Sequence, residues 1–132
     1  MKISKECPTL IYTRCKEQFG ADWDKGVIIT YGDTIYTKSG HISPDLVVHE
    51  MTHIEQQNKV GPDIWWDKYF SDKDFRLSQE VEAYSNQAKF IKENVKDRNK
   101  RFSMVNHIWK MMATMYDGMI SYEKAKLLIP LY

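Results

Sequence analysis

His49, Glu50 and His53 belong to the segment HEMTH, in which two histidines lie four positions apart and a glutamate directly follows the first. If this segment is helical, both imidazoles project from one face, one turn apart, and can bind a single cation. Zinc is the ion that two histidine nitrogens at this spacing favour. Glu50 then lies beside the ion, where it can act as a general base without being a ligand. These three residues predict a zinc-dependent hydrolase.

A catalytic zinc usually has three protein ligands, so a third ligand is needed. The candidates outside the motif are His41, Glu80, Glu82 and His107. A helix expected to begin at Ser78 and end near Asp97 has an apolar stripe that must face the core. Glu80 lies at the edge of this stripe and Glu82 on the solvent side, so helical phase selects Glu80. We interpret His41 and His107 as ordinary surface or core histidines.

Tyr84 follows Glu80 by one helical turn, so its side chain is expected to point toward the same cluster. Its hydroxyl could orient a histidine that binds the metal, or donate a hydrogen bond to the oxyanion formed during hydrolysis. The alternative is a core tyrosine whose hydroxyl has another partner. Both interpretations of Tyr84 stay open at the level of sequence.

The motif must lie in the middle of a helix. Ser43 is a suitable N-cap, Pro44 fits the first helical position and Asp45 suits the positive end of the helix dipole. This helix is expected to continue to about Val60. Before it, residues 27–40 contain two β-branched and aromatic runs around the dipeptide GD, which predicts a hairpin.

Further helices are expected over residues 8–20, 63–72, 103–116 and 121–129, with a turn at Asp117 and Gly118. The chain has 132 residues, which suits one domain spanning residues 1–132. The predicted fold class is α+β, a mainly helical domain with a small antiparallel sheet before the motif helix.

Composition argues against several classes of function. The 19 basic and 18 acidic residues leave a net charge of +1, so no nucleic-acid partner is expected. No apolar run approaches the roughly 20 residues of a membrane span, and the first ten residues lack a secretory signal, so we expect a cytoplasmic protein. Cys7 and Cys15 would lie about 12 Å apart along a helix, too far for a disulfide.

The motif together with the segment EVEAY resembles the gluzincin family of zinc metallopeptidases, in which a second helix supplies a glutamate to the zinc. The segment fits E-x-x-A-(Asp or Tyr), with Glu80 first and Tyr84 last, and is similar to small minigluzincins and phage-encoded peptidase-like proteins. The resemblance implies a zincin-like fold, a zinc cofactor, a peptide or protein substrate and, for a phage protein, the host cytoplasm. It also implies that an edge strand, Thr34 to Lys38 here, binds substrate by strand addition.

We therefore expect a zinc metallopeptidase in which Glu50 accepts a proton from water and passes it to the leaving amine. One alternative is a non-catalytic, zinc-containing binding module that recognises a host or virion protein through the aromatic residues Trp65, Trp66, Tyr69 and Phe70. The same rings could instead complete the core. A third alternative is a structural protein without metal. Composition and motifs do not set the oligomeric state.

Overall fold

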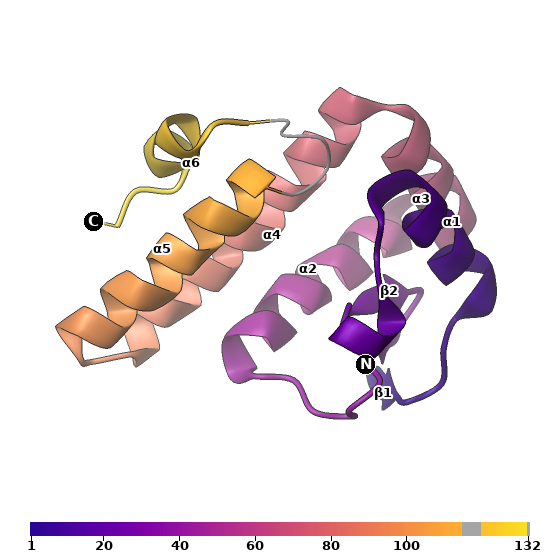
Figure 1. The fold of residues 1–132 in the computed structure, drawn as a ribbon, viewed down its shortest axis with the longest axis horizontal. Coiled ribbons are helices and arrows are strands. Elements are labelled where there is room, and N and C mark those ends of the chain that lie inside the picture. Colours follow the sequence, from indigo (N-terminus) through magenta and orange to yellow (C-terminus); the bar gives the residue numbers. More distant parts are fainter. Residues whose placement is uncertain (115–119, 132) are drawn as a thin grey trace.

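The structure, a computed structural model, describes residues 1–114 and 120–131. It is mostly helical with one small three-stranded sheet, so the predicted α+β class is confirmed (Figure 1). The turn expected at Asp117 and Gly118 lies outside the described residues. Among the described residues, no helix is long and apolar enough to cross a membrane.

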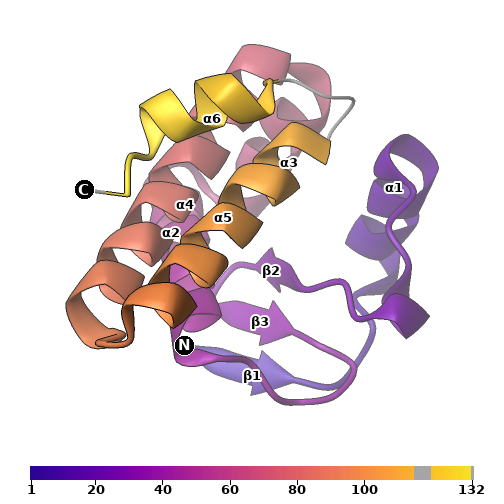
Figure 2. The ribbon, with the colours of Figure 1, turned by 60° about the vertical axis from the view of Figure 1, so that its left-hand side comes forward.

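The sheet contains the predicted hairpin and one strand that sequence patterns did not indicate. Strands β2 (Ile29–Tyr31) and β3 (Thr34–Tyr36) pair antiparallel, and Gly32 in the connecting turn has a positive φ of 63° that favours glycine. Strand β1 (Lys2–Ser4) pairs parallel with β3, so the sheet is mixed rather than antiparallel (Figure 2).

The order β1-β3-β2 places β3 in the centre of the sheet. The expectation that Thr34 to Lys38 forms an edge strand for substrate is therefore wrong, because both sides of β3 are already paired with other strands. The strand edge that faces the motif helix belongs to β2 instead, whose Thr30 contacts that helix.

The helices are α1 (Thr9–Phe19), α2 (Pro44–Val60), α3 (Pro62–Ser71), α4 (Lys73–Asn94), α5 (Arg98–Thr114) and α6 (Tyr122–Leu128), with a 3-10 turn at Trp23–Lys25. The predicted helix α2 is confirmed, with Pro44 at its first turn and Gly61 after its end. Helix α3, which holds the aromatic run, begins at the next proline, Pro62.

Two helices begin earlier than predicted. Helix α4 begins at Lys73, because Asp72 accepts a hydrogen bond from the backbone N–H of Phe75, whereas the predicted cap Ser78 lies inside the helix. Helix α5 begins at Arg98 rather than Ser103, because the carboxylate of Asp97 accepts bonds from the backbone N–H groups of residues 99 and 100.

Two apolar clusters form the core, one on each side of α2 and α4. The first joins α1, β2 and α3 and includes the buried rings of Trp65, Trp66 and Tyr69. The second joins α4, α5 and α6 and includes Ile91 and Ile108. Helix α2 packs along α4 (Figure 1). The face that these two helices share therefore lies between both clusters, and the motif residues project into it.

Candidate metal centre

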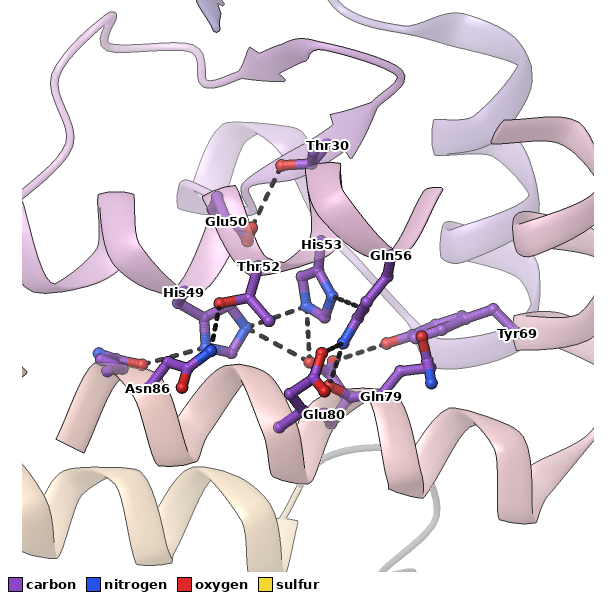
Figure 3. Close-up of polar contacts among 12 residues, drawn as sticks. Thr30, His49, Glu50, Thr52, His53, Gln56, Tyr69, Gln79, Glu80 and Asn86 are labelled. Carbon is purple, nitrogen blue, oxygen red and sulfur yellow. Dashed lines mark hydrogen bonds and ion pairs between the residues drawn. The ribbon is translucent and has the colours of Figure 1, made fainter. Parts of the chain in front are cut away.

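His49, His53 and Glu80 meet between α2 and α4, as the sequence predicts (Figure 3). The Nε2 atom of His53 lies 2.8 Å from Oε1 of Glu80 and 3.1 Å from Nε2 of His49. The Nε2 atom of His49 lies 3.3 Å from the same carboxylate oxygen. All three side chains are buried. The helical phase of α4 explains the meeting, because Glu80 shares its buried face with Tyr84 and Gln87.

The geometry of these three residues fits a metal ion. Two imidazole nitrogens and one carboxylate oxygen form a ligand set of catalytic zinc sites, with bonds of about 2.0–2.2 Å. In a tetrahedron with such bonds, neighbouring ligand atoms lie about 3.3 Å apart. The three separations here, 2.8, 3.1 and 3.3 Å, are close to that spacing. The group could therefore hold a metal ion after small side-chain movements.

A buried glutamine fixes the orientation of His49. The Oε1 atom of Gln87 lies 3.1 Å from Nδ1 of His49, and the amide nitrogen of Gln87 donates to Asp45 at 2.8 Å. Because the carboxylate of Asp45 accepts from the amide nitrogen, the amide oxygen must face the imidazole, where it can only accept. The Nδ1 atom of His49 therefore carries the proton, which leaves Nε2 to face the metal-binding group.

Gln56 does the same for His53. Its Oε1 atom lies 2.8 Å from Nδ1 of His53, while its amide nitrogen donates to the backbone carbonyl of Gln79 and to Glu82, each at 3.0 Å. Neither glutamine was predicted from the sequence as a partner of these histidines. A signal was present, since Gln56 follows His53 by three residues and Gln87 follows Glu80 by seven, and both spacings keep the pairs on one helix face.

The charge of Glu80 is balanced by its neighbours. Burial opposes ionisation of Glu80, but the two histidines beside it outweigh burial and hold its pKa well below the ordinary value. Burial likewise opposes the charged form of His53, yet Glu80 raises the pKa of His53 to about 9. The second carboxylate oxygen of Glu80 accepts a 2.7 Å hydrogen bond from the hydroxyl of Tyr69 on α3. This role of Tyr69 was not predicted from the sequence.

Glu50 lies next to the metal-binding group and is not part of it. Its Oε2 atom accepts a 3.2 Å hydrogen bond from the hydroxyl of Thr30 on β2 (Figure 3). Burial raises the pKa of Glu50 above its ordinary value, partly offset by His49 and His53. A carboxylate with a raised pKa is better matched to accepting protons near neutral pH.

The remaining candidates differ in their relation to the centre. Tyr84 is buried, and its ring packs edge-on against His49 with 4.4 Å between ring centroids. This ring contact restricts the rotation of His49. Glu82 is exposed, as predicted, and accepts from Gln56. His41 is exposed in the loop before α2.

A pocket of about 300 Å³ opens beside the metal-binding group. Its wall includes all three members of the group together with Glu50, Thr30 and Tyr84, and α5 contributes His107, Ile108 and Met111. His107, which was interpreted from the sequence as an ordinary surface or core histidine, is exposed and lines this pocket.

The aromatic residues of α3 are buried in the core. Trp65 is 1% exposed, and Trp66, Tyr69 and Phe70 are each at most 8% exposed. Their rings contact one another at centroid distances of 4.9–6.1 Å. The interpretation of these rings as core is therefore the one that the structure supports, although Trp65, Trp66 and Tyr69 also line the pocket beside the metal-binding group.

The two cysteines are both free, with Cys15 buried in the first apolar cluster.

Comparisons of the chain with protein-family models, curated proteins and solved structures gave no match. The assignment of the metal-binding group therefore depends on this chain's own geometry.

Proposed function

We propose that this chain is a zinc-dependent hydrolase that cleaves peptide bonds, built on a zincin-like arrangement of helices. The observation that carries the proposal is the buried group His49, His53 and Glu80 in the wall of a pocket that Glu50 also lines. The motif and its resemblance to gluzincins favour zinc as the ion. A bound zinc ion supplies Lewis acidity, which polarises a carbonyl group and lowers the pKa of water to about 7.

Glu50 acts as the general base. Its carboxylate takes a proton from the attacking water and delivers it to the nitrogen of the leaving amine. The hydroxyl group of water is added to the carbonyl carbon as the carbon–nitrogen bond breaks, so nothing is oxidised or reduced. The hydrogen bond from Thr30 holds one carboxylate oxygen of Glu50, which limits rotation of the side chain and keeps the base aimed at the pocket.

Tyr84 supplies a hydrogen-bond donor for the oxyanion of the tetrahedral intermediate. Burial, with added repulsion from Glu80 and Glu50, raises the pKa of Tyr84 well above its ordinary value, so the phenol keeps its proton at neutral pH. A neutral phenol can donate to a developing negative charge. Its position in the pocket wall, with its ring against His49, supports this role.

The test compares the parent with Glu50→Gln, using a mixed peptide library with added zinc and, in parallel, with a chelator. The amide keeps the size of the side chain but cannot accept the proton, so hydrolysis should fall by about 10²–10⁴-fold while zinc content stays unchanged. Glu55→Gln is the matched control, since Glu55 is exposed on the same helix. Equal hydrolysis by the parent and Glu50→Gln would reject Glu50 as the base.

A further inference from the structure

The two carboxylate oxygens of Glu80 have different partners (Figure 3). The Oε1 atom lies 2.8 Å from Nε2 of His53 and 3.3 Å from Nε2 of His49, so it belongs to the metal-binding group. The Oε2 atom instead accepts a 2.7 Å hydrogen bond from the hydroxyl of Tyr69 on α3. One oxygen of Glu80 is thus available to an ion, and the other is engaged by a phenol.

Helix α4 holds Tyr69 at two points, one helical turn apart. The guanidinium group of Arg76 donates to the backbone carbonyl of Tyr69 at 2.6 Å, and Glu80, four residues later, accepts from the hydroxyl of the same tyrosine. Arg76 and Glu80 are both buried, each with an exposed fraction of 4%. Tyr69 is therefore held against α4 through its backbone and through the tip of its side chain.

Packing holds the ring of Tyr69 in the same place. The ring stacks on Trp65 with 4.9 Å between ring centroids, and Trp66 and Phe19 pack edge-on to it at 5.1 and 6.0 Å. Tyr69 is 3% exposed. The ring cannot move its hydroxyl away from Glu80 without disturbing the first apolar cluster, so the hydrogen bond is present before any ion binds.

We infer that Tyr69 is a positioning residue that keeps Glu80 a ligand through one oxygen only, an inference that rests on the zinc site of the proposed function. A carboxylate that binds through both oxygens adds one to the coordination number of the ion. Glu80 could bind in that way only by giving up the hydrogen bond from Tyr69. Two imidazole nitrogens and one carboxylate oxygen then make three protein ligands, the number in catalytic zinc sites that keep a fourth position open.

Tyr69 also affects which ion the metal-binding group prefers. Calcium and magnesium take six or more ligands, mostly oxygen atoms, whereas zinc is commonly bound by four nitrogen, sulfur or oxygen ligands. By engaging the second oxygen of Glu80, Tyr69 lowers the number of oxygen ligands that the group offers. The group then favours zinc, with its remaining position open to the pocket that Glu50 also lines.

The test compares the parent with Tyr69→Phe, after metal has been removed by a chelator and Co²⁺ has been added as a spectroscopic substitute for zinc. Four-coordinate Co²⁺ absorbs visible light more strongly than five-coordinate Co²⁺. The variant keeps the packed ring and loses only the hydroxyl that engages Oε2 of Glu80. We expect weaker absorption per bound Co²⁺ in Tyr69→Phe. Zinc affinity in a chelator competition should fall by about 10–100-fold, because the released carboxylate must be ordered when the ion binds.

Tyr12→Phe is the matched control. The hydroxyl of Tyr12 accepts from the backbone N–H of Trp23, and the residue packs against the first apolar cluster but lies outside the metal-binding group. Its Co²⁺ spectrum and zinc affinity should equal those of the parent. An unchanged Co²⁺ spectrum in Tyr69→Phe, or the same change in both variants, overturns the inference.

The parent protein supplies a measurement that needs no variant. We expect its Co²⁺ form to show the intense absorption of four-coordinate Co²⁺, and the weak absorption of six-coordinate Co²⁺ would overturn the inference while leaving a metal site in place. A parent that binds neither Zn²⁺ nor Co²⁺ would instead refute the proposed zinc site, and the inference with it.

Discussion

Replacing Glu80 with glutamine is expected to lower the pKa of His53 in the metal-free chain. With Glu80 present, the pKa of His53 is about 9 against an ordinary value of 6.5, a difference that corresponds to about 3 kcal/mol. Burial is the largest single influence on the pKa of His53, and it opposes the charged form of the imidazole. Without the carboxylate, burial dominates, so the pKa of His53 in Glu80→Gln should fall below 6.5.

The assay is a pH titration of the imidazole proton resonances by NMR, with the protein stripped of metal by a chelator. The variant Glu93→Gln is the matched control, because Glu93 is exposed near the end of the same helix and should leave the pKa of His53 unchanged. A parent pKa at or below 6.5, or a pKa that stays near 9 in Glu80→Gln, would refute the pairing of His53 with Glu80.

Two more predictions concern the same centre. The stabilising effect of protonated His53 is complete below pH 6.5 and is lost as the pH rises through about 9, whereas that of ionised Glu80, whose pKa is depressed, is lost only in acid. Urea denaturation of the metal-free chain should therefore show the free energy of unfolding falling by about 3 kcal/mol between pH 6.5 and above 9, and a flat profile would contradict this. Gln87→Leu removes the acceptor for the Nδ1–H of His49, so zinc affinity in a chelator competition should fall by about 10–100-fold, with the exposed Lys89→Leu as control. Unchanged affinity in Gln87→Leu would show that the hydrogen bond does not position His49.

The metal-binding group could be predicted from sequence because its signals are local. The spacing of His49 and His53 fixes their shared face as soon as the segment is helical. The helical phase of α4 separates Glu80 from Glu82 without knowledge of the fold. The hairpin followed from Gly32 and its neighbour, since a two-residue turn needs residues that accept positive φ.

Local signals of this kind could not assign Tyr69, Thr30 or Gln57. Tyr69 reaches Glu80 from α3, and Thr30 reaches Glu50 from β2, so both contacts depend on how separate elements pack. Glutamine is typical of exposed helix positions, yet Gln57 is buried, and its side-chain amide donates a hydrogen bond to the backbone carbonyl of Thr30 in β2. Such contacts arise from tertiary structure, for which the local pattern carries no signal.

The errors in the predicted helix starts and strands have similar causes. Residues 72 and 78 are both good helix caps, and Asp72 is the one used. Between them, Arg76 is buried and its guanidinium donates to the backbone carbonyl of Tyr69, a tertiary contact that accompanies the earlier start. The strand β1 has only three residues and gains its order from pairing with β3, which lies about thirty residues away in the sequence. The helix and strand propensities of single residues are too weak to predict where α4 begins or that β1 forms.

The most direct test of the metal-binding group is the zinc content of the purified chain, combined with X-ray absorption at the zinc edge. The geometry predicts one zinc ion per chain, with two imidazole nitrogens and one carboxylate oxygen among its ligands, and loss of that zinc in His49→Ala. A parent protein that binds no zinc at micromolar free metal, or a His49→Ala variant that keeps it, would contradict the assignment of His49, His53 and Glu80 as ligands of one ion.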